Sequence, residues 1–557
     1  MKTDFEIARE TDVRPIVEIA ASLGMQEDDL VLYGRHMAKV PLPVLRRYDD
    51  HPDGKLILTT AITATPAGEG KTVTTIGLVQ GLGAMGLSVM GALREPSLGP
   101  TFGIKGGATG GGRSQVYPMW DINLHFTGDI HAVGAAHNLL SALLENHMAK
   151  GNRLGIDPTQ VMLRKAMDMN CRELRHLVVG LGGKKQGGIP HESGFVITSA
   201  SEISAILALA QDHEDLRERL GRMTVAYTYG GRPVTAADLD GVGALLVLLK
   251  DAINPNLVQT LEGQPVFVHG FPFANIAHGT NSIIATRSAL KMADYVVTES
   301  GFAADLGAEK FFDIVCRQSG LSPDAVVLVA SLRALKMHGG ASLDDCIQSN
   351  ADALRSGFSN LDRHVSNTRG FGIPVVVCLN IFPGDTQEEV EMLRQHCSRL
   401  GVRMACSTVF TDGGQGALEL AAEVLKAMEE EPKDFRLLYP DEMSIKEKVE
   451  TVAKNIYGAG QVVFLRQAEK AMEEIIANGH GHLPVCMAKT QASITDNPEL
   501  KGAPTGWKLT VREMYASTGA GFVVPVCGQI SLMPGLPSSP SALRMDMDED
   551  GNITGLH

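Results

Sequence analysis

The sequence predicts an α/β fold organised around a mostly parallel sheet. Short apolar, β-branched runs alternate along the chain with stretches of helical periodicity, which is the pattern of buried parallel strands and the helices that cover them. The chain has 557 residues, of which 44% are hydrophobic, so it can bury large cores and is long enough for several domains. A glycine-rich loop stands between one apolar run and a helical pattern, an arrangement typical of doubly wound α/β sheets.

The expected strands are apolar runs rich in β-branched residues. They lie at residues 56–62, 87–93, 195–198, 265–268, 295–298, 325–330 and 374–379. Helical patterns separate them, for instance at residues 241–253 and 388–400. Charged residues are densest over 426–448, which we expect to be a linker or an exposed helix end. No internal repeat or low-complexity segment is detectable.

The glycine-rich loop has the residues of a phosphate-binding loop. It reads Thr65, Pro66, Ala67, Gly68, Glu69, Gly70, Lys71 and Thr72. Its glycines let backbone N–H groups turn toward a phosphate, Lys71 can reach the outer phosphates of ATP, and the Thr72 hydroxyl can hold Mg²⁺. The usual pattern begins with glycine, and Thr65 departs from it. An ordinary glycine turn that caps a helix is the alternative, but it would not require lysine and threonine after the last glycine. These residues therefore predict an ATP site.

Arg94 directly follows the expected strand at residues 87–93. Because neighbouring parallel strands end at the same edge of a sheet, its guanidinium should lie beside the loop phosphates. There it can bind a transferred phosphoryl group or a carboxylate in bidentate fashion. A surface ion pair with Glu95 is the alternative. The dense glycine run at residues 103–113 predicts a loop that approaches a ligand closely, and its basic residues favour an anion. A flexible surface linker is the other interpretation of this run.

Composition narrows the class of protein. The formal charge of −14 argues against nucleic acid as a partner. The first six residues lack the apolar core of a signal peptide, and the longest apolar run, near residues 242–249, is too short to span a membrane. The eight cysteines form no C-x-x-C pair and several lie in apolar runs, as expected for reduced core thiols. We therefore expect a cytoplasmic enzyme that acts on small molecules.

Blocks spread along the whole chain resemble formate–tetrahydrofolate ligase, the monofunctional formyltetrahydrofolate synthetase family. The blocks lie at residues 65–75, 94–112, 127–132, 272–279, 304–313, 333–340, 486–491, 502–506 and 533–537. Their order carries the resemblance, which spans nearly all of the chain. It implies a large P-loop NTPase-like domain with a mostly parallel sheet plus two smaller α/β domains, assembled as a homotetramer. We expect the large nucleotide-binding region within residues 1–370, with an inserted subdomain, and smaller domains that contribute a folate slot within 371–557.

The resemblance also implies a reaction. ATP would convert formate, a poor acyl donor, into formyl phosphate, and the amine of tetrahydrofolate would then attack the formyl carbon to give 10-formyltetrahydrofolate, ADP and phosphate. Phosphoryl transfer needs positioning and charge neutralisation more than covalent help. Lys71, the loop N–H groups, Mg²⁺ held by Thr72, and Arg94 would supply both. The implied cofactors are ATP, Mg²⁺ and an activating monovalent cation, K⁺ or NH₄⁺.

The family assigns roles to further positions. Arg94 matches an arginine that binds formyl phosphate, and we expect Gly106 and Gly107 of the glycine run to contact the same group. Glu95 matches an acid tied to the monovalent cation. Asp129 resembles a residue that contacts the pterin, where a carboxylate can accept two N–H bonds from the aminopyrimidine edge. The general base for the amine stays open.

The pterin itself would lie between two aromatic rings. Phe382 matches the family's phenylalanine, whereas Phe410 stands where the family commonly has tryptophan, and it can stack with less area. A core role is the alternative for either ring. Asp412 replaces a usual lysine and reverses a charge near the expected position of the folate tail. Phe271 replaces a glycine before the Pro-Phe-Ala-Asn block.

Two other functions are compatible with parts of the sequence. The loop and the strand after it also resemble nucleotide-switch ATPases of the partitioning type, although those carry a second lysine early in the loop, where this chain has Pro66 and Ala67. A carboxylate-activating ligase of dethiobiotin-synthetase-like fold would explain residues 56–112. It would not explain the blocks beyond residue 260.

Overall fold

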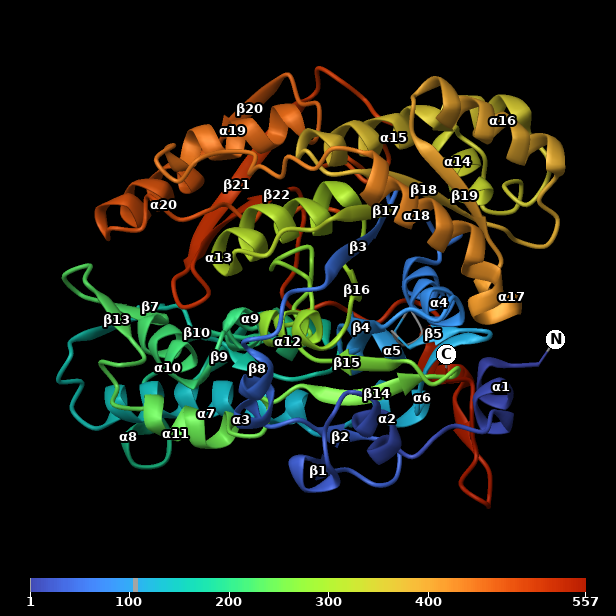
Figure 1. Ribbon diagram of the computed structural model, residues 1–557. Helices are drawn as coiled ribbons and strands as arrows, with labels where there is room; N and C mark the ends of the chain where they lie inside the picture. Colours follow the sequence, from blue (N-terminus) through green and yellow to red (C-terminus); the bar gives the residue numbers. More distant parts are fainter. Residues whose placement is uncertain (1, 104–108, 557) are drawn as a thin grey trace.

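The protein is a mixed α/β structure built around one large, mostly parallel sheet (Figure 1). The computed structural model describes residues 2–103 and 109–556. The α/β class predicted from the alternating pattern is confirmed. In the described part of the chain, none of the helices combines the length and the apolar character that crossing a bilayer requires.

The parallel part of the sheet contains most of the predicted strands. In spatial order it runs β15 (Pro265–Val268), β4 (Val89–Leu93), β16 (Tyr295–Glu299), β3 (Lys55–Ala61), β17 (Ala325–Ser331), β18 (Val375–Asn380) and β19 (Arg403–Ser407). Beyond β15 the sheet continues through the antiparallel strands β14 (Asn256–Thr260), β2 (Ala38–Lys39) and β1 (Val31–Leu32). This order places β16 beside β3 and β4 beside β16, so the carboxyl ends of all three meet near the glycine-rich loop.

Helices cover both faces of the sheet. On one face lie α4 (Lys71–Ala84) and α18 (Leu418–Glu430), and on the other lie α12 (Ile283–Met292) and α15 (Ala351–Gly370). Along β3, Ile57 and Ala61 pack in the core with α4 and α18, whereas Leu56 and Leu58 belong to the core on the opposite face. Burial of both faces explains why the strands are continuous apolar runs.

One predicted strand is much shorter than expected. Within residues 195–198 only β11 (Phe195–Val196) forms a strand, and it pairs in parallel with β8 (Lys165–Ala166) outside the main sheet. The hydroxyl-rich residues that follow begin a helix. The Ser201 side chain accepts the backbone N–H of Ser204 at 3.2 Å and so caps α9 (Glu202–Leu209).

The C-terminal part forms a second, smaller sheet with its own helices (Figure 1). Its elements are α19 (Ile445–Asn455), β20 (Gln461–Phe464), α20 (Arg466–Ala477), β21 (Lys508–Ser517) and β22 (Phe522–Cys527). Residues 431–444, between α18 and α19, contain neither helix nor strand, which confirms the predicted linker. The division at residue 370 stays a prediction about domains, but the main sheet does not end there, because β18 and β19 belong to it.

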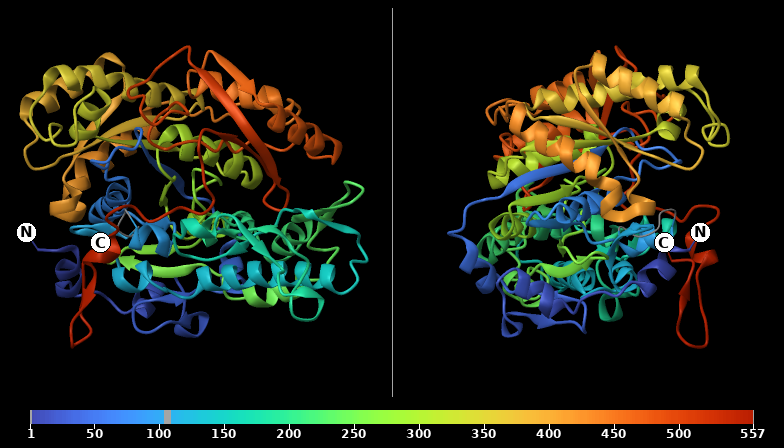
Figure 2. Two further views of the ribbon diagram at one scale, coloured as in Figure 1. Left: turned by 180° about the vertical axis from the view of Figure 1, so that it is seen from behind. Right: turned by 45° about the vertical axis from the view of Figure 1, so that its right-hand side comes forward.

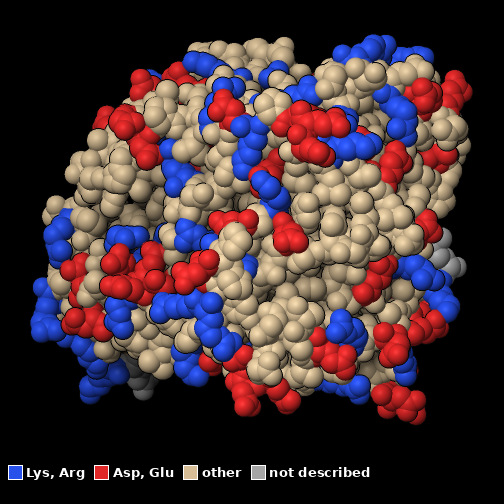
Figure 3. All heavy atoms as spheres, viewed as in Figure 1, with Lys and Arg blue, Asp and Glu red and all other residues tan. Residues whose placement is uncertain are grey.

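The predicted helices at 241–253 and 388–400 correspond to α11 (Val242–Leu249) and α16 (Gln387–Arg399). The two terminal segments lie close together in both views of Figure 2, where the Arg9 guanidinium donates to the Asn552 side chain at 2.7 Å. Figure 3 shows acidic and basic side chains intermixed over one face of the molecule. On that face the acidic side chains are not gathered in a single block.

Candidate active site

A cavity of about 340 Å³ opens where the strands β3, β4 and β16 end. Its lining includes residues 68–73 of the loop and helix start and residues 94–97 after β4. Phe271, Phe273 and Phe302 form an apolar side of the same cavity. The sequence predicts a ligand at this edge of the sheet, and the structure brings the loop and Arg94 together there.

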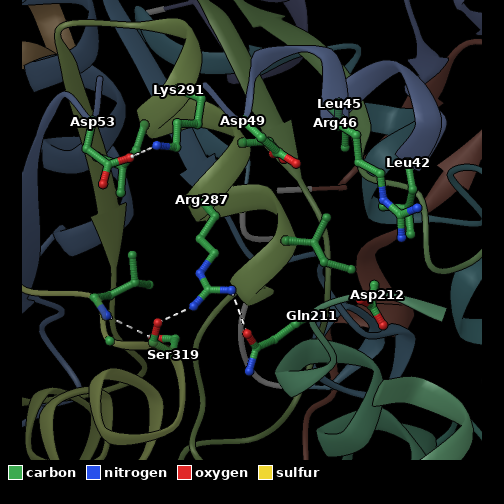
Figure 4. Close-up of a pocket in the computed structure, with 15 residues that line it drawn as sticks. Leu42, Leu45, Arg46, Asp49, Asp53, Gln211, Asp212, Arg287, Lys291 and Ser319 are labelled. Carbon is green, nitrogen blue, oxygen red and sulfur yellow. Dashed lines mark hydrogen bonds and ion pairs between the residues drawn. The ribbon is translucent and has the colours of Figure 1, made fainter. Parts of the chain in front are cut away.

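A larger cavity, of about 510 Å³, lies elsewhere and contains none of the predicted site residues (Figure 4). Its charged groups bond within the protein. The Arg287 guanidinium donates to the Gln211 side chain at 2.5 Å and to the Ser319 carbonyl, and Lys291 pairs with Asp53 at 3.0 Å. Because both cations already bond to groups of the protein, size alone does not make this cavity the candidate site.

The glycine-rich loop connects β3 to α4 in a conformation that requires glycine. Gly68 and Gly70 have φ values of 75° and 77°, in the left-handed region that side chains rarely adopt. A Cβ at Gly70 would also lie 2.4 Å from the Asn380 amide nitrogen. Thr65, the departure from the usual pattern, has a place here, because its backbone N–H and hydroxyl donate to the Glu69 carboxylate at 2.7 and 3.0 Å. This pair of bonds closes the loop.

The outer part of the loop does not reach the cavity. Pro66 and Ala67 form a turn outside the cavity lining, and Pro66 is exposed. Gly70 is the N-cap of α4, so Lys71 and Thr72 occupy its first turn and line the cavity. A helix N-terminus with these two side chains presents donors and positive potential to an anion.

A buried carboxylate that the sequence analysis missed lies among these groups. Glu299 ends β16 and is fully buried. One of its oxygens pairs with Lys71 and accepts the Thr72 hydroxyl at 2.9 Å, and the other lies 3.8 Å from Arg94 Nε. Burial opposes ionisation of Glu299, but the charges of Lys71 and Arg94 and the bonds from Lys71 and Thr72 outweigh it, so its pKa lies below the ordinary value.

Asn380, which the sequence analysis also missed, fixes the loop from the end of β18. Asn380, the last residue of β18, donates its amide N–H groups to the Glu69 and Gly70 carbonyls at 2.7 and 3.3 Å. Its amide oxygen accepts the Thr74 hydroxyl at 2.9 Å. These bonds tie the loop and the first turn of α4 to the strand that leads to Phe382.

Arg94 lies at the end of β4 and lines the cavity, with its side chain 21% exposed. Its carboxylate neighbour is Glu299 rather than the adjacent Glu95, so the surface ion pair considered as an alternative is not what the structure has. The Nε atom is buried without a hydrogen-bond partner among the described residues. The guanidinium therefore retains a donor for a ligand.

Glu95 also lines the cavity and lies near the carboxylates of Asp129 and Asp168. It is buried, and its Oε2 atom has no hydrogen-bond partner within the described part of the chain. Burial and the nearby charge of Asp129 raise its pKa well above the ordinary value, Lys39 opposes them, and Asp168 adds to the rise. A buried carboxylate with an uncompensated oxygen fits a cation that prefers oxygen ligands.

Asp129, at the start of α7 (Asp129–Ala149), is buried in an ion pair. Its carboxylate lies 2.8 Å from Lys39 Nζ, and it accepts the Asn256 side chain at 2.8 Å. Both charged side chains are 2% exposed. A pterin contact at Asp129 stays a prediction, and it would have to share this carboxylate with Lys39.

The two predicted folate rings follow neighbouring parallel strands. Phe382 comes after β18, and the Arg333 guanidinium lies over its ring, 4.6 Å from the centroid. Phe410 comes after β19, is 43% exposed, and its carbonyl accepts the Arg113 N–H at 2.9 Å. Exposure of Phe410 argues against the core role considered as an alternative. Gly106 and Gly107 lie outside the described residues.

Comparison with known proteins decides the family. A family model described as formate–tetrahydrofolate ligase matches residues 2–557. A relative described by the same name, from Symbiobacterium thermophilum, is 54% identical over 557 residues, which cover 100% of both chains. The chain belongs to the formate–tetrahydrofolate ligase family. The resemblance inferred from the ordered blocks is thereby confirmed.

The departures from the family pattern lie in different settings. Phe271 is buried and lines the cavity, where its ring adds apolar surface next to the loop. Asp412 is exposed in the short helix α17 (Val409–Asp412), on the same turn as Phe410. The first departure therefore affects the shape of the cavity, and the second affects surface charge beside the predicted folate slot.

The signals for the missed residues were weak in the sequence. Glu299 directly follows the predicted strand 295–298, and an acid at the end of a strand beside a phosphate loop is a recognisable pattern once the neighbouring strand is known. Phe302, three residues on, has φ 56°, an uncommon value for a residue other than glycine, and lines the cavity. Nothing local marks Asn380, whose role depends on its place beside the loop.

Proposed function

We propose that the protein ligates formate to tetrahydrofolate at the expense of ATP, with formyl phosphate as the intermediate. The observation that carries the proposal is the convergence of Lys71, Thr72 and Arg94 on one cavity in a chain of this family. A loop with helix N-terminal donors fits the ATP phosphates. The Arg94 guanidinium, at the end of β4, fits the group that is transferred.

In the first step, a formate oxygen attacks the γ-phosphorus of ATP, and the bond from that phosphorus to the bridging oxygen of ADP breaks. Lys71 and the loop N–H groups offset the charge on the phosphate oxygens. Arg94 binds the formyl phosphate as it forms and holds it beside the folate end of the cavity. We expect Gly106 and Gly107 to contribute backbone donors to the same group.

In the second step, the amine nitrogen of tetrahydrofolate attacks the formyl carbon, the bond from that carbon to the phosphate oxygen breaks, and phosphate leaves. The nitrogen loses one proton in the process. Phe382 and Phe410 would stack on the two faces of the pterin, and Asp129 would accept N–H bonds from its aminopyrimidine edge. Adjacent strand ends place the two rings on the same side of the sheet as the loop.

Two cations belong to the proposal. Mg²⁺, when bound, would neutralise charge on the ATP phosphates, and the Thr72 hydroxyl is placed to hold it. The hydroxyl and the carboxylate oxygen bonded to it are the hard donors that this ion prefers. The buried Oε2 of Glu95, which has no hydrogen-bond partner among the residues that the structure describes, fits the monovalent cation, K⁺ or NH₄⁺.

We further propose that the protein works in the cytoplasm as a homotetramer. All eight cysteines are free thiols, as expected in a reducing compartment. Sedimentation of the purified protein at several concentrations would test the assembly. A single monomeric species at all of them would contradict it.

The function is tested by measuring phosphate release from ATP with formate, tetrahydrofolate, both or neither. We expect rapid release with formation of 10-formyltetrahydrofolate only when both substrates are present. A nucleotide-switch ATPase would release phosphate with neither. A ligase for another carboxylate would remain inactive with formate but respond to its own acid, and either result would overturn the proposal.

A further inference from the structure

Glu299 is a buried carboxylate beside Lys71, Thr72 and Arg94, and neither bond-making step of the proposed reaction uses it. In β16 it pairs with Thr59 of β3, so its side chain projects beside the start of the loop. Three groups assigned to ATP or formyl phosphate, Lys71, Thr72 and Arg94, surround it. A residue with these neighbours affects each of them.

The two carboxylate oxygens are in different situations. Oε2 accepts both the Lys71 ammonium and the Thr72 hydroxyl. Oε1 faces Arg94 at 3.8 Å and has no hydrogen-bond partner among the described residues. Before nucleotide binds, Glu299 is therefore hydrogen-bonded to Lys71, which the phosphates require, and to the Thr72 hydroxyl.

The arrangement is electrostatically unfavourable for ATP alone. A fully buried negative charge beside the loop repels the phosphates, and it competes with them for Lys71. A divalent cation reverses this effect, because a carboxylate and a hydroxyl from adjacent elements form an oxygen-rich half-site that the phosphates complete. In other P-loop proteins an acid at the end of a neighbouring strand serves the metal in this way.

We propose that Glu299 is a positioning residue that makes nucleotide binding depend on Mg²⁺. It holds Lys71 and Thr72 in place before ATP arrives. It then releases Lys71 to the phosphates and turns its charge to the metal ion that accompanies them. The inference rests on the proposed use of ATP, but it concerns nucleotide binding and is independent of formate and folate.

The role predicts two opposite effects in the isosteric variant Glu299→Gln. Without Mg²⁺, a non-hydrolysable ATP analogue should bind more tightly than in the unaltered protein, by on the order of tenfold, because a buried repulsive charge has gone. The further tightening that Mg²⁺ produces should fall by about tenfold or more, because the metal has lost its carboxylate partner. A purely structural role would weaken binding under both conditions.

Isothermal titration calorimetry of the full-length protein with the analogue, with Mg²⁺ or with EDTA, measures both effects. Glu202→Gln is the matched control, since this carboxylate lies away from the cavity and accepts the Gly519 and Ala520 N–H groups. It should leave the Mg²⁺ dependence unchanged. Glu299→Asp retains the charge and should not tighten Mg²⁺-free binding.

Two results would overturn the proposal. One is a folded Glu299→Gln protein that binds the analogue with unaltered affinity and unaltered Mg²⁺ dependence. The other is available even if every variant at this position fails to fold: a crystal structure of the unaltered protein with Mg²⁺ and the analogue in which Lys71 still contacts Glu299 instead of phosphate. Failure of formate-dependent activity, with the opposite calorimetric shifts intact, would reject the proposed reaction and leave the role of Glu299 standing.

Discussion

The two ends of the candidate active site are built differently. At the phosphate end, Lys71 and Thr72 both bond to the buried Glu299, and Asn380 fixes the loop that leads into them. At the folate end, Phe410 is 43% exposed and the ring of Phe382 is covered by an arginine side chain. At the phosphate end the side chains already contact one another without a ligand. At the folate end the exposed face of Phe410 would be covered only when the pterin binds.

The difference has a physical cause. A buried charge is costly without compensation, and the buried Glu299 carboxylate supplies the counter-charge for Lys71. An aromatic ring has no charge that must be compensated, so it can be partly exposed at the end of a strand when no ligand is bound. Substitutions at the phosphate end should therefore cost more than substitutions at the folate end.

The largest effect is expected for Lys71→Ala. Loss of charge compensation should raise the free energy of the transition state by about 2–4 kcal/mol, and kcat/KM should fall accordingly. The Glu299 carboxylate keeps Thr72 and the more distant Arg94, so we expect the protein to stay folded. Steady-state kinetics and thermal unfolding of the same preparation measure the two effects separately.

The double variant Lys71→Ala, Glu299→Gln provides the control, because it removes the charge and its counter-charge together. It should unfold at the same temperature as the unaltered protein or higher and remain inactive. Near-normal turnover in folded Lys71→Ala protein would place Lys71 outside the phosphate site.

Arg94→Ser should have a somewhat smaller effect, on a different substrate. In the proposed reaction Arg94 faces the transferred group rather than the base or ribose, so ATP affinity should be nearly unchanged. The apparent barrier to formate-dependent phosphate release should rise by about 1.5–3 kcal/mol, which slows the release. Equilibrium binding of ATP and turnover at varied formate separate the two. Reduced ATP affinity with an unaltered formate response would contradict the assignment.

Asn380→Ala tests whether the phosphate end depends on the strand that leads to the folate end. Removal of the bonds to the Glu69 and Gly70 carbonyls should loosen the loop and weaken ATP binding by about 1–2 kcal/mol. Asn380→Asp is the matched control, because it keeps the shape and the acceptor for Thr74 but loses both donors. If the aspartate variant binds ATP normally, the donors do not hold the loop.

Local patterns in the sequence were sufficient for six of the seven parallel strands of the main sheet and for the loop, whereas the edge strand β19 was not predicted. The six predicted strands are buried on both faces and appear as apolar runs, and the loop needs its glycines and its Lys-Thr pair whatever surrounds it. Antiparallel β14 was not predicted, because three of its five side chains, those of Asn256, Gln259 and Thr260, are polar yet buried. Their burial depends on partners elsewhere in the fold.

The missed site residues have the same explanation. Glu299 reaches the loop because β16 lies between β4 and β3 in the sheet, although it follows both by about 200 residues in the sequence. Asn380 acts on a loop that lies about 310 positions earlier in the chain. Lys39, the partner of Asp129, is separated from it by 90 positions. Sequence periodicity gives no information on such pairs. The family resemblance points only to residues that lie in the family's motifs, and neither Glu299 nor Asn380 lies in one of the matched blocks.

The smallest effect is expected at the folate end. If Phe382 and Phe410 enclose the pterin, Phe410→Trp should tighten tetrahydrofolate binding by roughly 0.5–1.5 kcal/mol through added aromatic contact. Room for the larger ring is available, since Phe410 is 43% exposed. Phe410→Ala should weaken binding, and ATP affinity should change in neither variant, because the ring does not line the cavity at the phosphate end. The Michaelis constant for tetrahydrofolate measures the effect. A clash with neighbours adapted to phenylalanine would make the tryptophan variant weaker, which still places the ring in the slot. An unchanged constant in both variants would remove Phe410 from the folate site and leave only one of the two predicted rings.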